Sequence, residues 1–276
     1  MKNFKILLLS ALFIGLNSCS SDEKKDEVVI EEPSGNFQKR VLVEDYTGTW
    51  CGWCPRVAYG IELVEEATDK AVVVAIHRGD SNPSSGGYDP YNFSAGALEN
   101  QIGLQGYPTA MLDRSIEWGY PEPNKVGQVV DLTTTNARLG LAIKSNVSGG
   151  NINLEVRTKF GSDFTNVKLV VYIIENGLTF DQVNYTTYYG GADILPNFSH
   201  NHVLRASVTN LLGDAFTAAE SLEGNEALKS FSIPVPTKVS NVANIEFVAF
   251  IVGGDNKAIN VRKSAPGEEQ TFEFVD

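Results

Sequence analysis

Two cysteines separated by two residues, in the segment TGTWCGWCP at 47–55, constrain this chain more than any other feature. The segment follows a β-rich run at 40–46 and opens a run with helical spacing at 54–68. A cysteine at a helix N-terminus lies at the positive end of the helix dipole, which favours the thiolate. Two intervening residues place the second sulfur within reach of the first in one helical turn. The pattern therefore predicts a strand–CxxC–helix unit, with Cys51 as the exposed nucleophile and Cys54 as the buried resolving thiol.

Two other interpretations of the cysteine pair stay open. The pair can form a structural disulfide that never turns over, or it can supply half of a metal site. A metal site would need distant histidines, and His200 and His202, together with His77, are weak candidates for binding copper or zinc. The alternative for these histidines is a structural pair at the start of a strand. We expect no resident metal and no cofactor.

The N-terminus predicts export to the cell envelope. Lys2 and Lys5 precede an apolar run of eleven residues at 6–16, which is shorter than the roughly 20 residues that a membrane-spanning helix needs. The following LNSC at 16–19 resembles a bacterial lipobox, which implies removal of residues 1–18 and acylation of Cys19. The alternative is an ordinary secretory signal. The polar, acidic stretch at 19–36 predicts a flexible tether. We expect a lipid-anchored protein of the bacterial outer membrane, either periplasmic or surface-exposed.

Composition narrows the possible partners and the domain count. Of the 276 residues 42% are hydrophobic, which is enough to bury a core, so extensive disorder is excluded. The chain has a net charge of −12 and therefore lacks the basic surface that nucleic-acid binding needs, so no nucleic-acid partner is expected. Three cysteines are too few for a disulfide-dense secreted mini-protein. A chain of this length predicts one large or two modest domains.

The pattern of predicted elements changes at about residue 138. Residues 37–137 alternate strand and helix signals, with strands at 40–46, 71–77 and 109–113, helices at 54–68, 94–102 and 125–137, and a long loop at 79–92. Residues 138–276 predict short strands separated by turn signals, with one small helix at 215–222. A last strand is predicted at 270–274. The fold class predicted is therefore an α/β domain at 37–137 followed by an all-β antiparallel sandwich domain at 138–276.

The segment VLVEDYTGTWCGWCP at 41–55 and the GYPT at 106–109 resemble the thioredoxin superfamily. That resemblance implies a thioredoxin-like fold for 37–137 and a cis-proline loop at Pro108 that binds extended substrate backbone. It also implies a buried carboxylate beneath Cys54, which accepts the proton of the resolving thiol. By spacing this carboxylate is Asp45, with the neighbouring Glu44 as the alternative. The candidate substrate-contacting residues are the nearby aromatic residues Trp50, Trp53 and Tyr107.

Two blocks extend the resemblance to a narrower family. EDYTGTWCGWCP at 44–55 and HNHVLR at 200–205 are similar to the lipoproteins of Bacteroidetes that are related to "outer membrane protein twenty-eight". This resemblance implies a thioredoxin-like module joined to a β-sandwich on a lipid anchor. It does not fix an activity.

Two functions follow from these observations. The first is thiol–disulfide exchange, with a cysteine-containing envelope protein as partner. Because the dipeptide between the cysteines tunes the reduction potential, the direction of exchange is left open. The second is a surface-anchored binding lipoprotein, in which the sandwich captures a ligand and the Cys51–Cys54 disulfide is structural. The tyrosine-rich segment at 185–191 would be a binding platform in that case, or otherwise a plug at the end of the sandwich.

Overall fold

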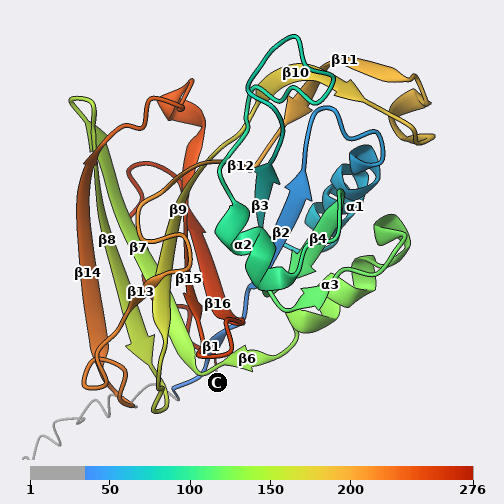
Figure 1. The fold of residues 1–276 in the computed structure, drawn as a ribbon. Helices are drawn as coiled ribbons and strands as arrows, with labels where there is room; N and C mark the ends of the chain where they lie inside the picture. The colour runs from blue at the N-terminus through green and yellow to red at the C-terminus, as the bar shows by residue number, and fades with distance from the viewer. Residues whose placement is uncertain (1–34, 276) are drawn as a thin grey trace, which may run out of the picture. The chain divides into compact units, whose positions relative to one another are not determined.

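The computed structural model describes residues 35–275, so the predicted signal peptide, Cys19 and nearly all of the tether lie outside the described residues. Within this range the chain is mostly β-sheet, with the helices α1 (Cys54–Ala67), α2 (Gly96–Ile102) and α3 (Val126–Leu132) and three short 3₁₀ turns (Glu122–Asn124, Tyr188–Gly190 and Val242–Asn244). None of the helices in 35–275 has the length and apolar character needed to cross a membrane. Figure 1 shows the arrangement.

A nine-stranded sheet runs through the described chain (Figure 1). Its order is β16-β15-β9-β12-β3-β2-β4-β5, and β13 pairs with β9 at the side. Strands from both predicted segments share this sheet, and they meet where β3 lies beside β12. The bounds are β2 (Val41–Thr47), β3 (Ala71–His77), β4 (Thr109–Leu112), β5 (Ile116–Glu117), β9 (Lys168–Glu175), β12 (Val203–Ser207), β13 (Asp214–Ala215), β15 (Ile245–Val252) and β16 (Ala258–Ser264).

Three smaller sheets complete the architecture. A three-stranded antiparallel sheet has the order β14-β8-β7, and two strand pairs are β1-β6 and β10-β11. The bounds are β1 (Phe37–Gln38), β6 (Asn136–Ala137), β7 (Leu139–Ser148), β8 (Asn151–Phe160), β10 (Leu178–Val183), β11 (Ile194–His200) and β14 (Glu226–Pro234). The strand β8 alternates exposed and buried residues, as expected for a sheet with one solvated face.

Alternation along the strands divides the core between the two faces of the large sheet. On one face, α1 and α3 pack over β2, β3 and β4, around Val43, Val73 and Val57. The three-stranded sheet packs against β9 and β15 in a separate cluster that includes Val171 and Phe247. The β2 residues of opposite parity, such as Leu42 and Tyr46, belong to a third cluster with α2. All seven residues of β2 are therefore buried, which fixes the position of the CxxC segment that follows.

Several predicted elements differ from the observed ones. The predicted helix at 215–222 is wrong, because Thr217 and Glu220 exchange side-chain and backbone hydrogen bonds that close a single turn. The predicted strand at 270–274 is also wrong: a single isolated bridge forms there, between Phe37 and Phe274. The helix predicted at 125–137 ends at Leu132. The division at 137/138 stays a prediction, and β10 and β11 were not predicted at all.

Candidate redox site

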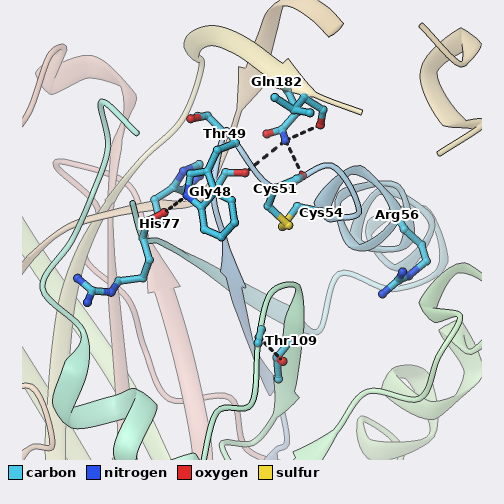
Figure 2. Close-up of a disulfide and its surroundings, with 12 residues drawn as sticks. Gly48, Thr49, Cys51, Cys54, Arg56, His77, Thr109 and Gln182 are labelled. Atoms are coloured by element: carbon cyan, nitrogen blue, oxygen red, sulfur yellow. Dashed lines mark hydrogen bonds between the residues drawn. A yellow bond between two sulfur atoms is a disulfide. The ribbon is translucent and has the colours of Figure 1, made fainter. Parts of the chain in front are cut away.

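The cysteine pair lies between the end of β2 and the start of α1 and forms a disulfide (Figure 2). The turn after Thr47 is closed by the backbone N–H of Cys51, which donates to the carbonyl of Gly48 at 3.0 Å. The N–H of Cys54 donates in turn to the carbonyl of Cys51 at 3.1 Å, and Pro55 follows in the first helical turn. Strand and helix thus position the sulfurs where the sequence predicts them.

Both cysteines are buried, although Cys51 was expected to be exposed. Cys51 is 4% exposed and Cys54 is 2% exposed. The β10-β11 hairpin and its loop, residues 178–200, pack against the backbone of the turn that carries them. The backbone N–H groups of Val183 and Tyr185 donate to the carbonyls of Thr49 and Gly52 at 2.9 and 2.7 Å. The hairpin therefore pairs with the backbone of the CxxC turn itself.

The side chain of Gln182 also binds the hairpin to the CxxC turn. Its Nε2 donates to the carbonyl of Cys51 at 3.0 Å and to that of Gly48 at 3.3 Å, as Figure 2 shows. Next to it, a Cβ added at Gly52 would lie 2.3 Å from the ring of Tyr185, so only glycine permits this close approach. The role of Gln182 was not predicted, because the contact joins residues about 130 positions apart and no local signal indicates it.

The aromatic candidates lie on two sides of the disulfide. Trp53 is 52% exposed and packs edge-on against Tyr185, with ring centroids 6.0 Å apart. Trp50 packs edge-on against Tyr107 at 5.7 Å. The peptide bond between Tyr107 and Pro108 is cis, and β4 begins at the next residue, beside β2. These residues therefore surround the CxxC turn, and their role in contacting a substrate stays a prediction.

The tyrosine-rich segment packs on α1 and does not plug the end of the sandwich. The ring of Tyr188 stacks on Tyr59 at 4.6 Å. The hydroxyl of Tyr189 donates to Glu62 at 2.9 Å, and burial raises the pKa of this tyrosine. This segment thus fastens the loop of the hairpin to α1 next to the CxxC turn.

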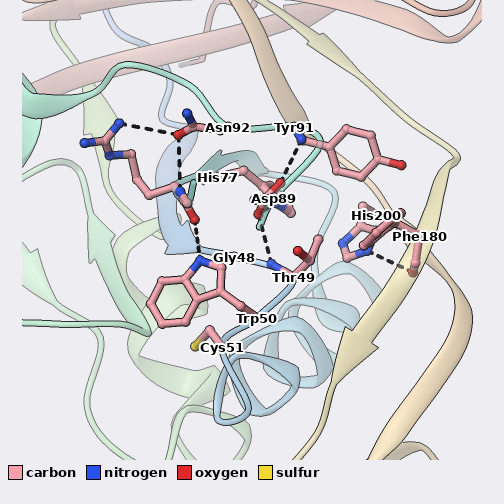
Figure 3. Close-up of polar contacts among 12 residues, drawn as sticks. Gly48, Thr49, Trp50, Cys51, His77, Asp89, Tyr91, Asn92, Phe180 and His200 are labelled. Atoms are coloured by element: carbon pink, nitrogen blue, oxygen red, sulfur yellow. Dashed lines mark hydrogen bonds and ion pairs between the residues drawn. The ribbon is translucent and has the colours of Figure 1, made fainter. Parts of the chain in front are cut away.

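The loop at 79–92 supports the other side of the CxxC turn (Figure 3). The carboxylate of Asp89 accepts from the backbone N–H of Thr49 at 2.9 Å and pairs with Nδ1 of His77 at 2.9 Å. The indole N–H of Trp50 donates to the carbonyl of Arg78 at 2.7 Å. The role of Asp89 was not predicted, because the loop shows only turn composition, and His77 was considered only as a weak candidate for metal binding.

Asp45 lies beneath the disulfide on the face of β2 that carries α1. It is 4% exposed and shares a cavity of about 70 Å³ with Cys54. Its Oδ1 has no hydrogen-bond partner among residues 35–275. Burial, assisted by the charge of Glu122 and opposed by Arg56, raises the pKa of Asp45 to about 8.

Glu44, the alternative carboxylate, points to the opposite face. There it forms an ion pair with Arg114 at 2.7 Å, in which both side chains are fully buried. Arg114 also donates to the hydroxyl of Tyr172 at 3.0 Å. The geometry therefore brings Asp45 to the cavity beside Cys54 and assigns Glu44 to the core.

The histidines line the same cavity but form separate pairs. His200 ends β11 and lies with its ring centroid 5.2 Å from that of His77; burial, followed by the charge of His77, lowers the pKa of His200 to about 4. His202 lies in the turn before β12 with φ +58°, so it does not continue the strand face of His200, and its Nε2 contacts Glu65 at 3.1 Å. Among the described residues, no group of three or more His, Cys, Asp or Glu has the arrangement to hold a metal ion.

A comparison with protein families matches residues 95–270 to the family described as outer membrane protein Omp28. The chain belongs to the Omp28 family. Its predicted outer-membrane location is thereby confirmed, while lipidation of Cys19 stays a prediction. The match begins downstream of the cysteine pair and includes the β10-β11 hairpin and the strands that follow it.

Solved structures similar to this Omp28-family chain come from several bacteria. HBP35 of Porphyromonas gingivalis has a TM-score of 0.63 at 18% identity, over 87% of this chain and 81% of that chain, which shows a shared fold. A protein from Agrobacterium tumefaciens has a TM-score of 0.48 at 13% identity, over 87% and 98%. A domain of the outer membrane lipoprotein Omp28 from Porphyromonas gingivalis has a TM-score of 0.30 at 17% identity, over 48% and 96%. No curated protein matches the chain significantly.

Proposed function

We propose that this outer membrane protein is a thiol–disulfide exchange protein of the thioredoxin-like type, acting through Cys51 and Cys54 on a cysteine-containing envelope protein. In the reductive direction the Cys51 thiolate attacks a disulfide of the partner and releases one partner thiolate. Cys54 then gives its proton to the carboxylate of Asp45 and attacks Cys51, breaking the mixed disulfide and releasing the second partner thiolate. The partner gains two electrons and the Cys51–Cys54 disulfide forms. The reverse sequence oxidises the partner.

The observation that carries this proposal is the environment of Asp45. A buried carboxyl with an oxygen that finds no partner in the described part of the chain is costly, so its presence beneath Cys54 needs an explanation. A pKa near 8 matches the carboxyl to the pKa range of a thiol, which allows proton transfer in either direction near neutral pH. A purely structural disulfide has no use for a matched proton acceptor.

The burial of the sulfurs adds a condition to the proposed exchange. Because both cysteines are buried and the segment around Gln182 is bonded to the CxxC turn, we expect this segment to move away before a partner sulfur reaches Cys51. The carbonyls of Thr49 and Gly52, now paired with the hairpin, would then be free to accept hydrogen bonds from the extended backbone of a partner. Trp53 already lies at the surface beside this position.

The reduction potential of the pair tests the proposal. The protein is equilibrated in graded glutathione buffers, and the thiols are trapped and assigned by peptide mass mapping. We expect a potential between about −120 and −270 mV, the range of exchange proteins. Asp45→Asn should slow exchange by about 100-fold at pH 7, whereas Asp131→Asn, an exposed control, should not change it. A potential below about −300 mV, with rates that do not depend on Asp45, would exclude the exchange function.

The burial of the sulfurs favours a second candidate, a binding lipoprotein with a structural disulfide. The main-chain hydrogen bonds between the hairpin and the CxxC turn are typical of a disulfide that has only a structural role. In that case the disulfide resists reduction by glutathione. Its reduction by a stronger reductant unfolds the hairpin, and the two thiols that form do not carry out exchange with a partner. The same titration separates the two candidates, because only the exchange protein is reduced reversibly with its fold retained.

A further inference from the structure

Two buried polar atoms on the cavity beneath Cys54 have no hydrogen-bond partner among the described residues. One is Oδ1 of Asp45 and the other is Nδ1 of His202. They come from chain segments more than 150 positions apart, yet both side chains line the same 70 Å³. A cavity of that size with polar groups on its wall is roomy enough for water, which needs at least about 10–15 Å³. Water there would satisfy both atoms and connect them.

The sheet explains why this space lies between the two side chains. Asp45 of β2 is level with Ala75 of β3, and the N–H of Ala75 donates to the carbonyl of His202 at 2.8 Å. Asp45 and His202 are thus two strand spacings apart, about 10 Å. The residue between them carries only a methyl group, and Ala75 itself lines the cavity. A larger side chain at this position would fill the space.

His202 also has a connection to solvent. Its Nε2 contacts Glu65 of α1 at 3.1 Å, and the side chain of Glu65 is 45% exposed whereas that of His202 is 12% exposed. The hydrogen bond to His202 lowers the pKa of Glu65, so this carboxylate is ionised at neutral pH and holds the ring by its Nε2 proton. That tautomer leaves Nδ1 as an acceptor, opposite the end that faces solvent.

The other ionisable groups around the cavity are engaged elsewhere. Glu62 of α1 accepts from Tyr189, His77 of β3 is paired with Asp89, and His200 of β11 contacts the carbonyl of Phe180. Arg56 and Glu122 act on Asp45, and Lys263 acts on Glu65. Glu62 is the exposed member of this set, and its carboxylate already accepts from Tyr189.

We propose that His202 and Glu65 form the proton route between Asp45 and solvent, a role that rests on the proposed exchange function. When Cys54 has passed its proton to Asp45, the Asp45 carboxyl passes it through cavity water to Nδ1 of His202. The imidazolium releases the Nε2 proton toward Glu65 and bulk water, which restores the Asp45 carboxylate. When the disulfide is opened instead, the same route delivers a proton inward to Cys54. His202 is a positioning residue for proton transfer, since it touches neither sulfur.

A two-step colour reaction tests this route in the full-length chain carrying Cys19→Ser, in detergent, so that the CxxC pair holds all the thiols. The reduced protein is mixed with Ellman's reagent. Attack by Cys51 releases one thionitrobenzoate, and attack by Cys54 on the resulting mixed disulfide releases the second. Only the second, intramolecular step requires Cys54 to lose its proton to Asp45.

We expect His202→Asn to slow the second step by about tenfold at pH 7, with the first step and the reduction potential unchanged. Asparagine tolerates the positive φ of this position, so the turn is retained. Ala75→Val, which fills the cavity, and Glu65→Gln at the exposed end should slow the same step. Glu62→Gln is the matched control, because this residue lines the cavity but is bonded to Tyr189. A merely structural role for His202 would change both steps or the potential.

The outcomes separate the two proposals. If the wild-type protein releases both equivalents, and the second step is within twofold of wild type in His202→Asn, Ala75→Val and Glu65→Gln, the proton route is wrong and the exchange function stands. If the wild-type protein does not release the second equivalent, the exchange function is wrong and the route is overturned with it. A slow second step in these three variants, with Glu62→Gln unchanged, supports the route.

Discussion

Replacing Asp45 by asparagine should make the oxidised protein more stable at alkaline pH. The ordinary pKa of an aspartate is 3.8, and burial raises that of Asp45 to about 8 in the folded protein. Between these values the unfolded chain releases a proton that the folded chain keeps, so the folded state loses stability as pH rises. Each pH unit corresponds to about 1.4 kcal/mol, and about four units give a loss of about 5 kcal/mol by pH 8. The asparagine of the variant does not titrate, so the stability of the variant does not decrease in this way as pH rises.

The Asp45→Asn substitution also destabilises the folded protein, and this effect dominates at low pH. The introduced amide is buried beside a position where the wild-type oxygen has no partner, and an unsatisfied amide costs about 1–3 kcal/mol. We therefore expect Asp45→Asn to be less stable than wild type near pH 4 and more stable by about 3 kcal/mol near pH 8, with a crossing between the two.

The quantity to measure is the difference in free energy of unfolding between wild type and Asp45→Asn. This is because the titration of His200 changes stability in the opposite direction to that of Asp45 over part of the pH range. Burial lowers the pKa of His200 to about 4, so the folded state gains stability as pH rises from about 4 to 6.5. In this window the two slopes cancel in wild type, and above about pH 6.5 the Asp45 slope acts alone. Subtracting the variant isolates the Asp45 contribution.

The assay is unfolding in guanidinium chloride without reductant, followed by tryptophan fluorescence at several pH values from 4 to 8.5. Asp131→Asn, at an exposed position, is the control and should track wild type throughout. If the stability difference between wild type and Asp45→Asn is the same at pH 4 and pH 8, the Asp45 pKa is ordinary, and the argument for a matched proton acceptor is refuted.

Three further outcomes follow from the structure. Gly52→Ala should displace Tyr185, whose ring lies 2.3 Å from the added methyl group, and should speed reduction of the disulfide by dithiothreitol about tenfold, read by thiol trapping. His200→Gln should remove the loss of stability that wild type suffers at low pH. The stability of the variant relative to wild type should therefore be about 3 kcal/mol greater at pH 4 than at pH 7, measured by chemical unfolding. Glu44→Gln should lower stability by about 3–5 kcal/mol, measured by the same unfolding assay, because it leaves the buried Arg114 without its counter-charge.

Matched controls identify the cause for the Gly52 and Glu44 variants. Gly127→Ala adds a methyl group where no atom lies within 4 Å, so the reduction rate should stay at the wild-type value. Glu117→Gln removes a charge from an exposed strand residue and should change stability by less than about 0.5 kcal/mol. Reduction of Gly52→Ala at the wild-type rate would show that the hairpin does not limit access to the sulfurs.

The sequence predicted the elements whose signals are local. The periodicity at 54–68 and the apolar run at 71–77 correspond to α1 and β3, and the CxxC spacing placed the disulfide. The β10-β11 hairpin was missed because most of its strand residues are polar or exposed, so its strands lack the regular alternation of buried apolar and exposed polar residues that predicts a strand. Contacts such as Gln182 with Cys51 depend on tertiary structure, and a single sequence holds no signal for them. The same is true of the contact between His202 and Glu65.

The junction of β3 and β12 has a consequence for how this chain can be divided. One registered pair, Ala75 with Val203, joins these strands, and β3 has β2 on its other side. A fragment ending at 137 would lose β12 and turn β3 into an edge strand of seven residues, which are mostly buried and, apart from His77, apolar. Such an edge offers free amide and carbonyl groups to any neighbouring chain and is prone to aggregate. A soluble fragment of the cysteine-bearing half therefore needs a substitute for the strand that begins at Val203.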